Sequence, residues 1–175
     1  MGQIKKYPPV KLIIGFIFND PAILNKAKNL LGRRFGKIDF ESDRLIFNQT
    51  DYYEKEFGKD LKRVFISFAK LIPYSALPKI KIITNKLEKK LSKPSRRMIN
   101  IDPGYLDLAK LVLASIKDYN HRIYLDRGIF AEITLTYQGN SFRPWEWTYP
   151  DYRTIDYIGI FNRIRGFYAQ QIKNK

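Results

Sequence analysis

The 175-residue sequence contains no cysteine and only one histidine. Without cysteine there are no disulfide bonds, thiolate zinc sites or cysteine nucleophiles, and a single histidine cannot build a histidine-rich metal site. We therefore expect neither zinc nor haem. Any metal would be a hard cation such as Mg²⁺, held by oxygen ligands.

Long hydrophobic runs are also missing. The longest candidate, residues 12–18, is far shorter than the roughly 18 to 20 residues of a membrane span. Lys11 interrupts the apolar N-terminal stretch and no small-residue cleavage site follows, so this stretch does not read as a signal peptide. We expect a cytoplasmic protein with no membrane partner, folded as one globular domain over residues 1–175.

Acidic residues are scarce, with 17 Asp and Glu against 32 Lys and Arg, which gives a net charge of +15. Residues 61–101 contain 11 basic residues and one acidic residue, and therefore carry two-thirds of this charge. Such a basic run attracts phosphate groups, either on nucleic acid or on a small ligand. A solvated lysine-rich surface of the kind found in heat-adapted proteins explains the run equally well.

Hydrophobic periodicity predicts an α+β fold with a mixed, mainly antiparallel sheet and about four helices. The opening β-α-β-β order resembles half of a ferredoxin-like unit. Residues 76–92 fit either a helix or a strand, and their length favours the helix. The predicted strands are 11–18, 37–41, 44–48 (a hairpin with 37–41), 63–68, 122–125 and 129–137, and the predicted helices are 21–35, 76–92, 103–117 and a last helix after Thr154.

The predicted helix at 103–117 is almost entirely apolar and would lie in the centre of the molecule. Asp102 would be its N-cap and Pro103 its first residue. A helix N-terminus can bind an anion, but the Asp102 carboxylate would accept one of the free donors itself and repel the anion. Capping alone is therefore the favoured role of Asp102.

A hairpin is predicted around residues 126–128, where Gly128 suits a positive φ. The expected register places Arg122 opposite Glu132 as an ion pair, and His121 opposite Ile133 on the apolar face. The pair is either part of a site or an ordinary half-exposed salt bridge. His121 is either a hydrogen-bonded structural residue or a catalytic base.

Residues 145–153 form an aromatic segment between two prolines, which prevents a buried strand throughout. We expect an ordered loop whose aromatic side chains either stack on a planar ligand or cover the hydrophobic core. A second polar segment, residues 48–56, combines acids with two tyrosines. This segment is either a solvated helix start or a further edge of the same site.

Two hypotheses for function follow. The first is a pocket protein that binds a phosphate-bearing small molecule or nucleotide, with an Mg²⁺-dependent enzyme as one form of it. The second is an RNA-binding module that uses the basic face of residues 61–101. For the pocket, the candidate acid/base groups or metal ligands are Glu132, Glu146, Asp151 and His121, and the candidate ligand contacts are Arg96, Arg97, Asp102, Tyr105, Arg122, Trp147, Tyr149, Tyr152 and Arg153.

Six strings of the sequence together resemble an uncharacterised prokaryotic family catalogued as a domain of unknown function. They are Val10-Lys-Leu, Thr50-Asp-Tyr-Tyr-Glu-Lys-Glu, Asn100-Ile-Asp-Pro-Gly-Tyr-Leu, His121-Arg-Ile-Tyr-Leu, Ala131-Glu-Ile-Thr-Leu and Glu146-Trp-Thr-Tyr-Pro-Asp-Tyr-Arg-Thr. The resemblance spans almost the whole chain. Some members of that family bear the automated label "GTP-binding protein", so the resemblance implies GTP binding as a possibility to test against the residues.

The sequence does not support a P-loop GTPase. The string nearest to a P-loop, residues 32–38, is one residue too short and has Ile38 where the metal-binding hydroxyl belongs. Residues 85–88, Asn-Lys-Leu-Glu, resemble the guanine-reading Asn-Lys-x-Asp element, with Glu88 in place of aspartate. A four-residue match with one substitution inside a predicted helix carries little weight.

Overall fold

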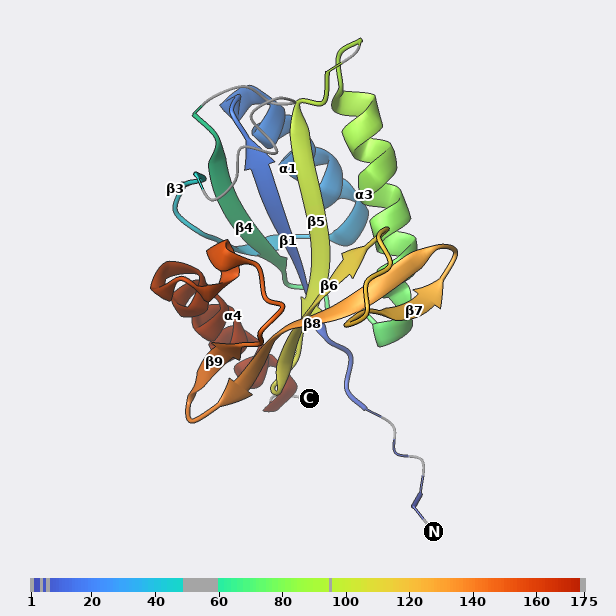
Figure 1. The fold of residues 1–175 in the computed structure, drawn as a ribbon, viewed down its shortest axis with the longest axis vertical. Helices are drawn as coiled ribbons and strands as arrows, with labels where there is room; N and C mark the ends of the chain where they lie inside the picture. Colours follow the sequence, from blue (N-terminus) through green and yellow to red (C-terminus); the bar gives the residue numbers. More distant parts are fainter. Residues whose placement is uncertain (1, 4, 6, 49–59, 95, 174–175) are drawn as a thin grey trace.

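The first half of the chain forms a complete β-α-β-β-α-β unit (Figure 1). In the computed structural model, which describes all residues except 1, 4, 6, 49–59, 95 and 174–175, its strands lie in the order β2-β4-β1-β5 and each neighbouring pair is antiparallel. This is the ferredoxin-like order, so the predicted half unit extends to a whole one. Its elements are β1 (Lys11–Phe18), α1 (Pro21–Phe35), β2 (Ile38–Glu41), β3 (Leu45–Ile46), β4 (Lys62–Phe68), the short 3-10 helix η1 (Tyr74–Ala76), α3 (Leu77–Leu91) and β5 (Ile99–Leu106).

Helices α1 and α3 cover one face of this unit. Alternate residues of β1, β4 and β5 point to that face, which is the pattern a strand imposes on its side chains. Leu12, Val64 and Ile99 are among the strand residues in this core, and Leu24 and Ile80 represent the two helices. The sheet strands are apolar on both faces because the second half of the chain covers the opposite side.

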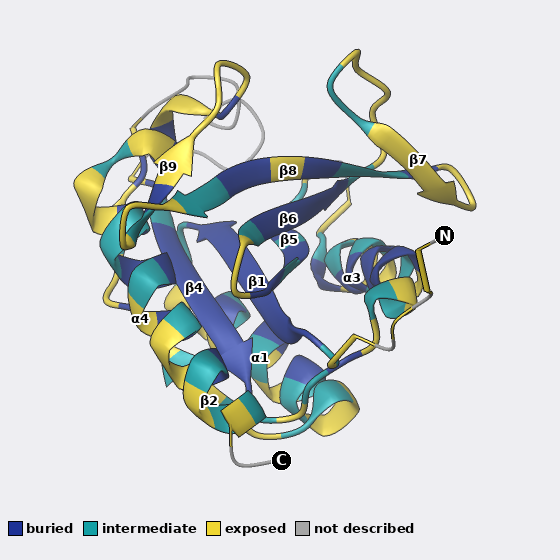
Figure 2. Cartoon of the chain, turned by 90° about the horizontal axis from the view of Figure 1, so that it is seen from below, coloured by how far each residue is buried: buried dark blue, intermediate teal, exposed yellow. Residues whose placement is uncertain are grey.

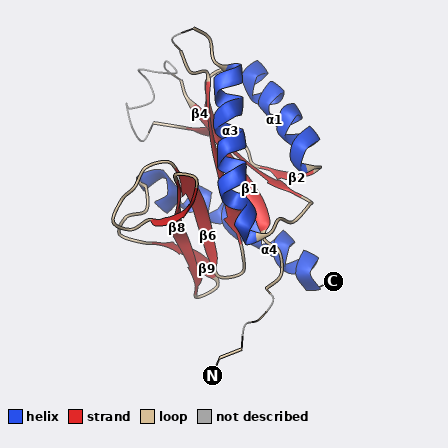
Figure 3. Cartoon of the chain, turned by 90° about the vertical axis from the view of Figure 1, so that its right-hand side faces the viewer, coloured by secondary structure: helices blue, strands red, loops and turns tan. Residues whose placement is uncertain are grey.

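The second half continues the same sheet and covers its other face. Strands β6 (Lys110–Ser115), β7 (Ile123–Asp126), β8 (Ile129–Gln138) and β9 (Ser141–Pro144) are all antiparallel to their neighbours. Figure 2 shows β8 crossing β1 and β4 at a steep angle, and Figure 3 shows β6, β8 and β9 turned away from the first strands. The 3-10 helix η2 (Pro150–Arg153) and helix α4 (Ile155–Lys173) follow, and α4 packs Phe161 and Ile164 against Ile13 and Phe65 of the central sheet.

The sheet divides where β6 leaves β5. Only residues 104–106 of β5 pair with β6, so the first part of β5 has an edge without a strand partner. Side chains of α3 replace that partner: the Ile101 N–H donates to Glu88 Oε1 at 2.6 Å, and Lys81 Nζ lies 3.4 Å from the Ile101 carbonyl oxygen. Pro103, on the same edge, has no N–H that would need a partner.

The predicted helix at 103–117 is wrong, because these residues form β5, a tight turn and β6. Asp102 therefore lies inside a strand and caps no helix. The turn is closed by the Asp107 carboxylate, which accepts from the backbone N–H groups of Ala109 and Lys110. β6 packs one face against α4 and the other against α3. Burial of both faces produces the continuous apolar run, and such a run does not distinguish a strand from a helix.

The predicted hairpin between 37–41 and 44–48 is also wrong. β2 and β3 do not pair with each other; both pair with β4, one after the other. Ser42 lies at the interruption, where its backbone N–H donates to the Phe65 carbonyl oxygen and its Oγ accepts the Phe65 N–H. The polar residues Ser42 and Asp43 therefore mark a break between β2 and β3, which both pair with the same strand, β4.

Helices α1 and α3 and the β7–β8 hairpin form where they were predicted, whereas β9 was not predicted. α1 begins behind Asp20, which accepts the Ala22 N–H, and residues 77–91 are helical as favoured. The β7–β8 hairpin turns through Arg127 and Gly128, both with positive φ, so its loop is one residue shorter than predicted. Within the described residues the α+β class is confirmed, with three α-helices where about four were predicted. None of these helices is both long and apolar enough to cross a membrane.

Candidate functional site

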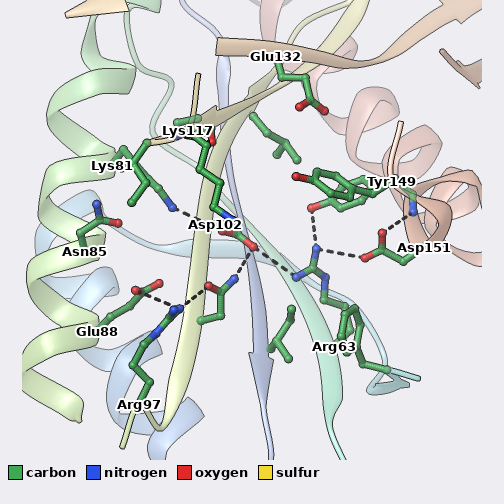
Figure 4. A pocket seen from close by; sticks show the side chains of 18 of the residues that line it. Arg63, Lys81, Asn85, Glu88, Arg97, Asp102, Lys117, Glu132, Tyr149 and Asp151 are labelled. Carbon is green, nitrogen blue, oxygen red and sulfur yellow. Dashed lines mark hydrogen bonds and ion pairs between the residues drawn. The ribbon is translucent and has the colours of Figure 1, made fainter. Parts of the chain in front are cut away.

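A cavity of about 780 Å³ lies where β6 diverges from β5 (Figure 4). Its walls are α3, the unpaired part of β5, the ends of β1 and β4, the end of β6, and β8 with η2 on the far side. This volume is typical of sites for small molecules. Among the residues the structure describes, the charged side chains that line it are Arg63, Lys81, Lys89, Arg97, Lys117 and Arg122, which are basic, and Glu88, Asp102, Glu132 and Asp151, which are acidic.

Helix α3 contributes a polar stripe to the cavity. Lys81, Asn85, Glu88, Lys89 and Ser92 all line it, and their spacing places them along one side of the helix. Lys81 is buried, with 7% of its surface exposed, and its ammonium lies 3.4 Å from Asp102 Oδ1. This stripe was not predicted from the sequence, although its period of three to four residues is visible between Lys81 and Ser92.

Glu88 is the acidic centre of this wall. Its Oε1 accepts the Ile101 N–H, and its Oε2 lies 3.4 Å from Arg97 Nη2. Arg97 Nη2 also donates to Asn100 Oδ1 at 2.7 Å. Burial raises the pKa of the Glu88 carboxyl to about 7, although Lys81, Arg97 and the Ile101 N–H act in the opposite direction. Glu88 therefore exchanges a proton near neutral pH.

Arg63 forms the floor of the cavity and is only 2% exposed. Its Nη2 donates to the Tyr152 hydroxyl at 2.8 Å, and its guanidinium lies 3.5 Å from Asp102 and 3.6 Å from Asp151. Rings enclose the cation, the nearest being Phe65 at 5.0 Å and Tyr152 at 5.2 Å from Cζ. Within the described residues its Nε and Nη1 have no hydrogen-bond partner. Burial raises the pKa of Asp151, and the attraction of Arg63 opposes that rise.

The predicted ion pair between Arg122 and Glu132 is confirmed, and it is buried instead of half-exposed. Arg122 Nε and Nη2 each lie 2.9 Å from Glu132 Oε2. The guanidinium also donates to Ser115 Oγ, to the Lys117 carbonyl oxygen and to the Tyr149 hydroxyl. Because its donors are used in this way, Arg122 holds β8, the end of β6 and the aromatic segment together.

His121 lies on the side of Glu132, not on the apolar face as predicted. Its Nε2 is 3.2 Å from Glu132 Oε2, and its ring stacks on Trp147 at 5.5 Å. The expected register is observed for Tyr124 opposite Phe130, and the bulge changes only the pairing next to the turn, where Asp126 replaces Leu125 opposite Ile129. His121 precedes β7, which begins at Ile123, so the alternation of the strand does not determine the side on which it lies. Ile133, the predicted neighbour of His121 on the core face, is exposed.

The aromatic segment divides between the two roles expected for it. Tyr149 and Tyr152 line the cavity, and Tyr152 also packs in the core on Phe161 at 5.8 Å. Trp147 instead lies outside the lining, where it stacks on Trp145 at 5.1 Å and donates to the Ile133 carbonyl oxygen. The segment is therefore partly a cavity wall and partly a cover of the sheet.

The structure brings about half of the predicted site residues together. Those that line the cavity are Glu132, Asp151, Arg97, Asp102, Arg122, Tyr149 and Tyr152. Those outside its lining are Glu146, His121, Arg96, Tyr105, Trp147 and Arg153.

Three of the outer residues have evident positions. Arg153 donates to the carbonyl oxygens of Thr148 and Glu146 and so fixes the aromatic segment. Tyr105 points to the opposite face of the sheet and packs on Tyr74. The side chain of Glu146 is exposed. The predicted polar segment 48–56 falls outside the described residues from position 49 onward.

Sequence reasoning did not select Arg63, Lys81, Asn85, Glu88 and Asn100 as site residues, although all five line the cavity. Within the described part of the chain, no three carboxylate or histidine side chains are placed to hold a metal ion. An Mg²⁺ ion at this site would therefore need ligand oxygens beside those of carboxylates. That requirement is ordinary for Mg²⁺, which often binds through one or two carboxylates and substrate phosphates.

Residues 8–168 match the family model described as "Domain of unknown function (DUF4416)". No curated protein and no solved structure matches the chain. The family match covers the strands and helices that build the cavity, and it agrees with the resemblance carried by the six sequence strings. The chain therefore belongs to this domain family of unknown function.

Proposed function

We propose that the cavity binds a phosphate-bearing small molecule, of which a nucleotide is one example. The observation that carries this proposal is a cavity of small-molecule size in which basic side chains outnumber acidic ones. A low-dielectric site with excess positive charge favours an anion more strongly than the same charges do in water. Arg63, buried at the floor, adds to this potential.

The phosphate would bind at the wall formed by α3 and β5. Lys81, Lys89 and Arg97 converge there with the side-chain amides of Asn85 and Asn100. Ammonium, guanidinium and amide groups are the donors that proteins use for phosphate oxygens. Lys89 is exposed, and the structure gives its ammonium no partner among the described residues, so it can turn toward a ligand.

The rest of the ligand would lie toward η2. Phe47, Tyr149 and Tyr152 offer rings on that side, and Leu113 and Ile116 offer apolar surface. A planar group fits such a wall because aromatic rings stack on it at little entropic cost.

The proposal extends to an enzyme that acts on the bound molecule in the same cavity. Asp151 is the predicted acid/base residue that lines the cavity with a raised pKa, and Glu88 shares that property. Raised carboxyl pKa values in a cleft are typical of groups that transfer protons. Glu132 is less suited to this role because Arg122 and His121 occupy the same oxygen.

The RNA-binding alternative has its own supporting observation. Lys79, Lys86 and Lys90 are exposed and their spacing places them on the solvent side of α3. A positive stripe of this kind attracts a nucleic-acid backbone in a salt-dependent manner.

Substitution of two neighbouring lysines of α3 distinguishes anion binding in the cavity from RNA binding on the helix surface. Lys89→Ala removes a charge from the cavity, and Lys90→Ala removes the same charge from the solvent side of the same helix turn. The two variants and the wild-type protein would be titrated with pyrophosphate, a nucleoside triphosphate and a short single-stranded RNA, with and without Mg²⁺, at moderate salt. Binding would be followed by thermal shift and calorimetry.

The proposal expects saturable binding of pyrophosphate or the nucleotide, weakened about tenfold by Lys89→Ala, since a charged hydrogen bond contributes roughly 1.5 kcal/mol. Lys90→Ala should leave this affinity within twofold of wild type. Binding of RNA alone, weakened by Lys90→Ala and lost as salt increases, would instead assign the function to the basic stripe. Equal effects of both variants on the small anions would overturn the cavity as their site.

A further inference from the structure

We infer that Glu88 links anion binding at this cavity to a proton: the anion binds to the form of the protein in which the Glu88 carboxyl is protonated. This inference rests on the proposed function and adds its regulation by pH. It concerns the same α3 and β5 wall to which the phosphate is assigned.

The two oxygens of Glu88 have different tasks. Oε1 accepts the Ile101 N–H at 2.6 Å and thereby completes the unpaired edge of β5. Oε2 lies 3.4 Å from Arg97 Nη2 and directs its negative charge at a cation of the phosphate wall. A proton on Oε2 would leave the bond to Ile101 intact, because a neutral carboxyl still accepts through its carbonyl oxygen. Protonation therefore changes the charge of the wall without removing a strand contact.

The charges around Glu88 come from every wall of the cavity. Lys81 and Lys89 belong to its own helix, Arg97 precedes β5, and Asp102 lies on β5. The charged groups on the remaining walls, among the residues the structure describes, are Arg63 on β4, Lys117 after β6, Arg122 before β7, Glu132 on β8 and Asp151 on η2. Figure 4 shows Glu88 and Lys81 on one side of the cavity, with Asp102 between them and Arg63. An ionised Glu88 would thus neutralise part of the charge that an anion needs, and would also repel the anion directly.

The titration range supports this linkage. Burial, the largest effect, raises the pKa of Glu88 to about 7, while Lys81 and Arg97 lower it and Asp102 raises it. A bound anion would raise this pKa further, so binding takes up protons near neutral pH. If the protonated form alone binds, affinity is constant well below pH 7 and falls tenfold per pH unit well above it. Between pH 6 and pH 8 the expected loss is about tenfold.

The test uses sulfate as the anion because its charge stays at −2 over this pH range, whereas phosphate gains charge. Calorimetric titrations at pH 6 and pH 8 would compare wild type with Glu88→Gln, which keeps an acceptor for Ile101 but has no ionisable group. Asp126→Asn is the matched control, because it removes the same charge from the exposed end of β7. Titration of wild type in two buffers of different ionisation enthalpy measures proton uptake directly and does not depend on any variant.

We expect wild type and Asp126→Asn to bind sulfate about tenfold more tightly at pH 6 than at pH 8, with proton uptake near pH 7. Glu88→Gln should bind equally at both pH values, with an affinity close to that of wild type at pH 6. Binding of sulfate by wild type without pH dependence or proton uptake overturns the inference and leaves the proposed function in place. An unchanged pH dependence in Glu88→Gln also overturns it. No binding of sulfate, pyrophosphate or nucleotide at either pH would overturn the proposed function and the inference together.

Discussion

Gly104 fixes the point at which β6 leaves β5, and a methyl group there should destabilise the protein. A Cβ atom at this position would lie 2.4 Å from the Val112 carbonyl oxygen and 2.8 Å from Leu113 Cδ2. The leucine side chain can move, but the oxygen is part of the β6 backbone. Carbon–oxygen contacts between strands are normally about 3.3 Å or longer, so β6 would have to move by roughly 0.9 Å.

That displacement sets the size of the effect. It would stretch interstrand N···O distances from about 2.9 Å to about 3.8 Å, beyond the range of a hydrogen bond. β5 and β6 share only the pairs from Gly104↔Leu113 to Leu106↔Leu111, so little of this short ladder would survive. Loss of about two hydrogen bonds at roughly 1 kcal/mol each, with repacking of Leu113, predicts that Gly104→Ala lowers the free energy of unfolding by about 3 kcal/mol.

Urea denaturation followed by circular dichroism measures this change. The control is Gly159→Ala in α4, where the new methyl group would have no atom within 4 Å apart from its chain neighbours and the nearby backbone of its own helix. This control should be neutral or stabilise the protein by up to about 1 kcal/mol, because alanine is the better helix former. A Gly104→Ala variant within about 0.5 kcal/mol of wild type would refute the close approach of β6 to β5 and the division of the sheet derived from it.

Two further predictions concern the charged residues of the cavity. Glu132→Ala should lower the free energy of unfolding by about 3–5 kcal/mol, because it leaves Arg122 buried without its carboxylate partner. Urea denaturation measures this loss, and a loss below about 1 kcal/mol would contradict the buried ion pair. For Glu88, whose pKa is raised to about 7, the folded state binds more protons than the unfolded state between pH 4.5 and 7, so its contribution to stability declines as pH rises through this range. From pH 5 to pH 8, the unfolding free energy of wild type should therefore fall relative to that of Glu88→Gln by on the order of 3 kcal/mol. Urea denaturation at the two pH values measures this change. A difference that stays the same at both pH values would contradict the raised pKa of Glu88.

The local sequence was sufficient to predict the helices and strands that have one exposed face or a clear capping signal at an end. Asp20, Pro21 and Gly36 bracket α1, and α3 shows an apolar stripe at helical spacing. Residues 103–117 were predicted as a helix because α3 and α4 cover opposite faces of β6, which removes the alternation that identifies a strand. The Asp102-Pro103-Gly104 string imitates a helix start, whereas its real setting is a partly unpaired strand edge.

The site was only partly predictable for a related reason. Arg122 and Glu132 lie on either side of one hairpin turn, so their pairing could be predicted by counting residues from that turn. Arg63 gains its role only when β4, β5 and η2 assemble around it, and nothing near it in the sequence indicates that burial. Glu88 was visible as the single acid in a basic run, and its spacing from Lys81 and Asn85 was the clue to a polar helix face.

The most direct test of anion binding in the cavity is NMR mapping of pyrophosphate binding on the ¹⁵N-labelled protein at moderate salt. Asn85 and Asn100 carry side-chain amides that line the cavity, and the Ile101 N–H reports on Glu88 beside them. We expect saturable shifts of these three groups with one dissociation constant, and small changes at Lys79 and Lys90 on the solvent side of α3. Shifts confined to the exposed lysines, with Asn85, Asn100 and Ile101 unmoved at saturation, would contradict anion binding in the cavity.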